Sequence, residues 1–319
     1  MRDFIVINYH VVSDQKIAHV AHLFPYKSPE MFDRDLEYLQ HSFRIVSYDQ
    51  ITEHLSGKKR LLPKSVALTF DDGLMECYEV VRPLLLKRGI PCMFFVSTDY
   101  IDNRGMAKEH KASLLIQQVL STDEKTVTQI NQELQKFFGY QILGKIDLIA
   151  QIKSTGIHDG SLIERLGSLL ELDFNGYLNE HTPYLTSTQI QTMDSEGFKI
   201  GSHGKDHIKF SDLTSTQIEE AMADSCFAIK NLTRKQSIPF AFPHNADDVS
   251  RLLLRKILDD HSHIGLLFDA NGISSEHNFL ISRLNGDRPH KGEESRSNLS
   301  INIKNAYIEE IATRFQRIR

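Results

Sequence analysis

Short, β-rich apolar runs alternate with segments of helical spacing along most of the chain, and this order restricts the fold more than any other feature. The runs at 4–9 (FIVINY) and 65–70 (SVALTF) are typical of buried strands. Shorter runs of the same kind lie at 45–48, 92–96, 198–202, 240–242, 264–268 and 279–282. Helical spacing of apolar residues is found between several of them, for example at 28–41 and 74–88. This alternation predicts a parallel sheet covered by helices, and about seven strands suit an α/β barrel.

The alternation stops between residues 101 and 184. This stretch contains helix-prone segments at 107–120, 122–138, 146–152 and 161–172. We therefore predict one barrel, formed by residues 1–100 and 185–319, that is interrupted by a helical insertion at 101–184. A chain of 319 residues has room for both.

Composition excludes several classes of protein. The net charge of −5 argues against a general binder of nucleic acid. The three cysteines form no C-x-x-C pair, so a thiolate zinc site is not expected. The first apolar run is too short for a signal peptide, and no run of 18 apolar residues exists. We expect a cytoplasmic protein without a membrane span, and the pattern leaves the oligomeric state open.

Ionisable residues follow four of the predicted strands. His10 follows the first strand and the pair Asp71 and Asp72 follows 65–70, while His203 and His207 follow 198–202. The run at 240–242 is followed by Pro243 and His244. In α/β barrels the chemistry lies on the loops at the carboxyl ends of the strands. We therefore expect these residues to lie at one end of the sheet.

Two of these groups together resemble a metal site. His203 and His207 are four residues apart, so both imidazoles can face one ion, and one carboxylate would complete a His₂-carboxylate set. Each motif also has a simpler interpretation. The histidines could be solvated, and Asp71-Asp72-Gly73 could be a turn with a helix cap.

These motifs resemble the signatures of the polysaccharide deacetylases with a NodB-type domain, a group that includes carbohydrate esterase family 4. Leu68-Thr-Phe-Asp-Asp-Gly73 is similar to the first signature and Ser202-His-Gly-Lys-Asp-His207 to the second. Phe240-Ala-Phe-Pro-His-Asn245 resembles the third. Asn8-Tyr-His-Val-Val12 resembles the Y-H-x-V opening of one branch, which includes poly-N-acetylglucosamine deacetylases. The resemblance implies a distorted (β/α)7 barrel and does not extend to the insertion.

The resemblance also implies roles. Asp72, His203 and His207 would hold one divalent metal ion, usually zinc. Asp71 would be the general base and His10 the general acid. The backbone N–H of His244, directly after Pro243, could donate to the oxyanion that forms at the acyl group.

Two departures from the family pattern concern the base and the substrate pocket. The third signature usually begins with an arginine that orients the base, whereas Ala241 stands here. Arg283 could replace this arginine or could be a surface cation, and we favour the surface position. The chain has no tryptophan, so the apolar lining of an acetyl pocket would come from Phe242, Phe268 or Leu280.

The predicted function is metal-dependent removal of an acetyl group from an N- or O-acetylated sugar of a surface polysaccharide or its precursor. The expected partner is an acetylated amino sugar or oligosaccharide. Two alternatives stay open. One is a deformylase or another small-amide hydrolase on the same scaffold. The other is a carbohydrate-binding protein with weak catalysis, which the departure at Ala241 motivates.

Overall fold

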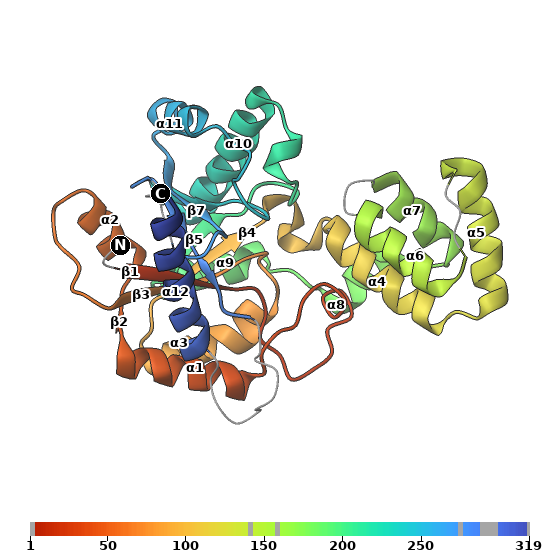
Figure 1. Ribbon diagram of the computed structural model, residues 1–319, viewed down its shortest axis with the longest axis horizontal. Helices are drawn as coiled ribbons and strands as arrows, with labels where there is room; N and C mark the ends of the chain where they lie inside the picture. Colours follow the sequence, from red (N-terminus) through yellow and green to blue (C-terminus); the bar gives the residue numbers. More distant parts are fainter. Residues whose placement is uncertain (1–3, 140–142, 157–159, 274–276, 288–298, 318–319) are drawn as a thin grey trace. The chain divides into compact units, whose positions relative to one another are not determined.

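The computed structural model describes residues 4–139, 143–156, 160–273, 277–287 and 299–317 (Figure 1). The chain divides into two compact units. The first consists of Met1–Asp14, Tyr26–Asp102 and Tyr184–Arg319, and the second of Gln15–Pro25 and Asn103–Pro183. The segment 15–25, which we had expected to belong to the barrel, is thus part of the second unit.

The first unit contains a parallel sheet. Its strands are β1 (Phe4–Tyr9), β2 (Arg44–Ile45), β3 (Ser65–Phe70), β4 (Met93–Val96), β5 (Lys199–Ser202), β6 (Ile238–Ala241), β7 (Ile264–Asp269), β8 (Leu280–Ser282) and β9 (Leu284–Asn285). The order is β8-β7-β6-β5-β4-β3-β1-β9, and β2 pairs with β3 alone. The strands at the two ends of this order, β8 and β9, are separated along the chain only by Arg283. The sheet therefore nearly closes on itself, which confirms the predicted barrel.

Helices follow the strands as expected for α/β connections. Those of the first unit are α1 (Pro29–Ser42), α2 (Tyr48–Leu55), η1 (Cys77–Val81), α3 (Arg82–Arg88), η2 (Thr98–Asn103, which ends in the second unit), α9 (Ser187–Ser195), η4 (Phe210–Asp212), α10 (Ser215–Thr233), α11 (Arg251–Asp260) and α12 (Leu299–Arg317). One expectation needs correction, because the run at 45–48 is only partly strand. Ser47 forms a capping box with Gln50, and α2 begins directly after it.

The second unit contains helices in its described part. They are α4 (Lys108–Ser121), α5 (Glu124–Phe138), α6 (Lys145–Gln151), η3 (Ile152–Gly156), α7 (Gly160–Leu169) and α8 (Phe174–His181). Within the described residues of either unit, no helix is long and apolar enough to cross a membrane.

The barrel interior positions the site. Alternate residues of a strand face the same side, so Val6 and Ala67 belong to one apolar layer, together with Phe95 and Phe268. Two residues further along, β1 and β3 carry Asn8 and Thr69, and these buried polar side chains hydrogen-bond to each other at 2.9 Å. A polar layer therefore follows the apolar interior towards the carboxyl ends of the strands.

Candidate active site

The turn after β3 carries two adjacent carboxylates, Asp71 and Asp72, whose backbone conformations differ. Asp71 continues the alternation of the strand, whereas Asp72 adopts a left-handed conformation with φ of 71°. Gly73 follows with φ of 70°, and a Cβ at this residue would lie 2.8 Å from Val96 Cγ1. The glycine is therefore required for a turn that packs tightly against β4.

Asp71 forms a bidentate ion pair with Arg283. The two guanidinium nitrogens Nη1 and Nη2 donate to Asp71 Oδ1 and Oδ2 at 2.7 and 2.8 Å. Asn8 Nδ2 also donates to Oδ2 at 3.0 Å. The Arg283 side chain is 0 % exposed, so the preferred expectation of a surface cation is wrong. Its position follows from the closure of the sheet, because Arg283 lies where the chain passes from β8 to β9.

The ion pair determines the charge of this carboxyl group. Burial opposes ionisation of Asp71, but the Arg283 guanidinium outweighs it and lowers the pKa of the carboxyl below its usual value. Asp71 is therefore ionised at neutral pH, as a general base must be.

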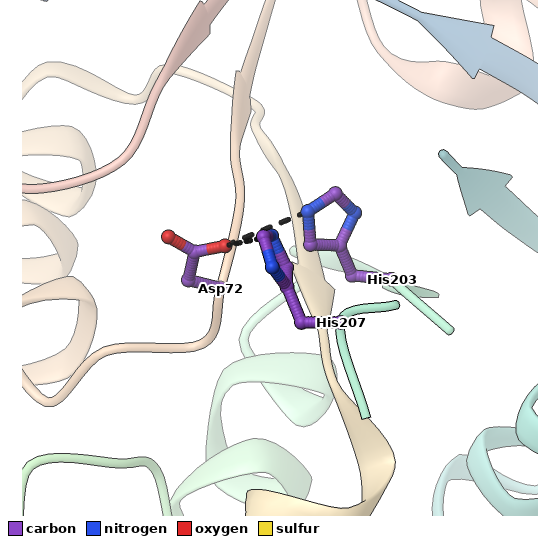
Figure 2. Close-up of side chains that lie close together, drawn as sticks. All are labelled: Asp72, His203 and His207. Carbon is purple, nitrogen blue, oxygen red and sulfur yellow. Dashed lines mark ion pairs between the residues drawn. The ribbon is translucent and has the colours of Figure 1, made fainter. Parts of the chain in front are cut away.

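Asp72, His203 and His207 converge on a small volume (Figure 2). Asp72 Oδ1 lies 3.5 Å from His203 Nε2 and 3.3 Å from His207 Nε2. This oxygen is buried and accepts no hydrogen bond of good geometry. A buried carboxylate oxygen without a hydrogen bond, facing two imidazole nitrogens, is the donor set that a divalent cation such as zinc takes.

The surroundings fix the orientation of His203. Its Nδ1 lies 2.9 Å from the carbonyl oxygen of Ala241 at the end of β6, which leaves Nε2 towards Asp72. Such a hydrogen bond selects the tautomer that a metal ligand needs. Burial lowers the pKa of His203 to about 4, so the imidazole is neutral at neutral pH. For Asp72, burial opposes ionisation, but the neighbouring imidazoles, His207 above all, outweigh it and lower its pKa well below the usual value.

The loop that carries both histidines is held by the segment after β4. The backbone N–H groups of Thr98 and Asp99 donate to the carbonyls of Gly204 and Lys205 at 3.1 and 2.9 Å. The Tyr100 hydroxyl donates to the carbonyl of Asp206 at 2.7 Å. These contacts escaped the sequence analysis, since backbone acceptors leave no pattern in side-chain types.

His10 is paired with an acidic residue that we had not predicted. Its Nδ1 lies 2.6 Å from Asp287 Oδ2, and its backbone N–H donates to Asp287 Oδ1 at 3.1 Å. Burial alone would lower the pKa of His10, but the Asp287 carboxylate outweighs it and raises the pKa to about 9. The imidazole therefore carries a proton at neutral pH. Asp287 also follows a strand, because β9 ends two residues before it. It was not predicted because the last predicted strand ended at 282 and β9 was missed.

The third signature forms the loop after β6. Phe242 is 1 % exposed and packs edge-to-face against Phe210 and Phe240, so it supports the loop from the core. Pro243 is buried as well, whereas His244 is exposed and has φ of 61°. The imidazole rings of His207 and His244 are 5.0 Å apart, which brings this loop beside the candidate metal ligands. Phe268 and Leu280, the other candidates for an apolar lining, are also buried.

Solved structures share this fold. The deacetylase PplD from Streptococcus pyogenes, solved with acetate, is 15 % identical with a TM-score of 0.57, covering 88 % of this chain and 91 % of its own. A de-N-acetylase from Aggregatibacter actinomycetemcomitans is 16 % identical with a TM-score of 0.57, covering 95 % and 99 %. IcaB from Ammonifex degensii is 18 % identical with a TM-score of 0.53, covering 88 % and 90 %.

The sequence itself points to one family. No curated protein sequence matches the chain. The sequence profile of the polysaccharide deacetylases matches residues 58–142 and 149–258, a region that contains Asp71, Asp72 and both histidines. This match covers more than half of the chain. The chain therefore belongs to the polysaccharide deacetylase family, hydrolases that act on carbon–nitrogen bonds other than peptide bonds.

Proposed function

We propose that the protein is a metal-dependent deacetylase of N-acetylated sugars in a surface polysaccharide or its precursor. The observation that carries the proposal is the convergence of Asp72 Oδ1 with the Nε2 atoms of His203 and His207, next to a carboxylate that Arg283 keeps ionised. These three residues would hold the divalent ion. When bound, the ion would polarise the acyl oxygen and lower the pKa of a nearby water.

The protein groups would carry the proton transfers. Asp71 accepts a proton from the attacking water, whose oxygen forms a bond to the acyl carbon. The backbone N–H of His244 donates to the acyl oxygen as it gains negative charge. His10 then gives its proton to the nitrogen as the C–N bond breaks, which releases acetate and the free amine. Such a reaction needs an ionised base and a protonated acid at one pH, and the two ion pairs support that division.

Arg283 also weakens the case for a binding protein without turnover. That alternative was motivated by Ala241 at the usual position of the orienting arginine. The guanidinium of Arg283 reaches both oxygens of Asp71 from the passage between β8 and β9, so the proposed base has its partner.

The test is metal analysis together with product analysis. Wild type, His203→Ala and His261→Ala would be purified, loaded with zinc and assayed on oligomers of N-acetylglucosamine. His261 is a matched control, because it pairs with Glu219 before β7, away from the carboxyl ends of the strands. We expect about one ion per chain and acetate release for wild type and His261→Ala, and loss of both for His203→Ala.

Other outcomes separate the alternatives. Equal, negligible metal in wild type and His203→Ala would contradict the metal site. Formate release from N-formyl sugars without acetate release would favour a deformylase. Stoichiometric metal without hydrolysis of any acylated amine would favour the binding protein.

A further inference from the structure

A buried carboxylate outside the three signatures fastens the loop after β6. Asp269, the last residue of β7, is 2 % exposed. Its Oδ1 accepts hydrogen bonds from the backbone N–H groups of Ala246 at 2.9 Å and Ala270 at 2.8 Å. Its Oδ2 accepts one from Asn271 Nδ2 at 3.0 Å. The two carboxyl oxygens of Asp269 thus join the loop after β6 to the segment after β7.

Two further contacts fasten the same loop. Asn271 Nδ2 also donates to Asp247 Oδ1. Arg251, the first residue of α11, donates from Nη1 to the carbonyls of Ala246 at 2.5 Å and Val249 at 3.0 Å. Ala246 is therefore held at both its N–H and its C=O group.

The fastened residue lies two positions after His244. His244 has a left-handed backbone, which is uncommon for a residue other than glycine and persists where the surroundings impose it. On the other side, Pro243 Cγ lies 3.4 Å from the position that a Cβ of Gly204 would occupy, so the loop also abuts the loop of the second signature. The backbone of His244 is thus fixed between Pro243 and Ala246.

We propose that Asp269 is a positioning residue for the reaction, which holds the His244 N–H where the acyl oxygen gains its charge. The proposal rests on the proposed function, in which His244 is the donor. Asp269 also contacts Arg283, but only through its backbone carbonyl, which accepts from Arg283 N at 2.9 Å and Nε at 3.3 Å. A change of the Asp269 side chain therefore leaves this backbone contact to Arg283, the partner of Asp71, in place.

The kinetic test compares Asp269→Ala with Asp269→Asn. Misplacing a donor for developing charge lowers kcat, and we expect a loss of about 10- to 100-fold for Asp269→Ala. KM, zinc content and the pH dependence set by Asp71 should be unchanged. Asp269→Asn keeps an oxygen for the N–H of Ala246 and loses the bond from Asn271 Nδ2, so its kcat should fall only about threefold, clearly less than that of Asp269→Ala.

A second variant covers the case in which Asp269→Ala fails to fold. Asn271 is exposed, and Asn271→Ala removes its contacts to Asp269 and Asp247, so kcat should fall about threefold or more. Asp248→Asn is the matched control, because it removes an exposed carboxylate from the same loop, and its kcat should equal that of wild type.

Hydrogen exchange measured by mass spectrometry tests the tether without any substrate. In Asp269→Ala or Asn271→Ala, the amides of 244–249 should exchange faster, while those of 65–72 should not change. Unchanged exchange at 244–249, or faster exchange with kcat equal to wild type, would overturn the proposal. A loss of zinc or a raised KM that accompanies the fall in kcat would also overturn it. Absence of deacetylation by wild type would instead contradict the proposed function, and the exchange experiment would still decide whether Asp269 holds the loop.

Discussion

The two sides of the candidate site each contain an ion pair, but the residue with the proposed catalytic role is the anion in one pair and the cation in the other. On one side a buried carboxyl group, Asp71, is kept ionised by the guanidinium of Arg283. On the other a buried imidazole, His10, is kept protonated by the carboxylate of Asp287. In both cases burial favours the neutral form and the partner outweighs it. The charged partner, more than the type of the buried residue, therefore decides whether each group is ionised at neutral pH.

The largest effect is expected on the base side. Asp71→Asn removes the proposed proton acceptor but keeps its shape and its neighbours, so kcat/KM should fall by about 10²- to 10⁴-fold. Zinc content should stay at the wild-type level, because the candidate ligands are untouched. Asp260→Asn, which changes an exposed carboxylate in α11, serves as the control for the loss of one negative charge. Activity near wild type in Asp71→Asn would contradict the proposed role of Asp71 as the general base.

Arg283→Met should produce the next largest effect. Without the guanidinium, burial raises the pKa of Asp71, so the base loses its proton only at higher pH. The acid limb of kcat/KM should therefore move upwards, and activity at pH 6 should fall by up to about tenfold for each unit by which the new pKa exceeds 6. Part of the loss should be recovered as the pH rises. Arg283→Lys keeps the charge without the bidentate geometry, so its activity at pH 6 should lie between those of wild type and Arg283→Met.

Asp287→Asn probes the acid side. The amide oxygen can still accept from the backbone N–H of His10, but the charge that raises the imidazole pKa is gone and the lowering effect of burial remains. The pKa of His10 should fall from about 9 towards its usual value of about 6.5, so the alkaline limb should move down by about two units. The loss at pH 8 should be at least about tenfold and smaller at pH 6. An alkaline limb that stays in place would show that Asp287 does not set the protonation of His10.

The smallest effect is expected for Asn8→Ala. This variant removes the 3.0 Å hydrogen bond to Asp71 Oδ2 and the bonds that Asn8 Oδ1 accepts from Thr69 and Arg283, while the ion pair between Asp71 and Arg283 stays. Only the first of these bonds reaches the carboxylate, so we expect a loss of kcat/KM of a few-fold, in keeping with about 1 kcal/mol for that hydrogen bond. A loss as large as that of Arg283→Met would mean that Asn8, rather than the guanidinium, controls the base.

The sequence predicted best what lies within one strand and the turn after it. Asp71 and Asp72 follow a buried strand, and His203 and His207 follow another, so the rule for carboxyl ends of parallel strands places them together. Arg283 was expected at the surface and Asp287 was not predicted, because the positions of both depend on the closure of the sheet. Arg283 lies at the passage from β8, which was predicted at 279–282, to the two-residue strand β9, which has no distinctive pattern. The inclusion of 15–25 in the second unit was missed for a similar reason, since it depends on contacts with residues far along the chain.

The protonation of His10 can be measured directly by ¹⁵N NMR of the imidazole as a function of pH, with the resonance assigned by its loss in His10→Asn. This measurement needs no substrate and bears on the claim that partner charges set the roles of acid and base. We predict that His10 is protonated at pH 7.5 and titrates near pH 9 in wild type. A titration near or below the usual value of about 6.5 would contradict the account.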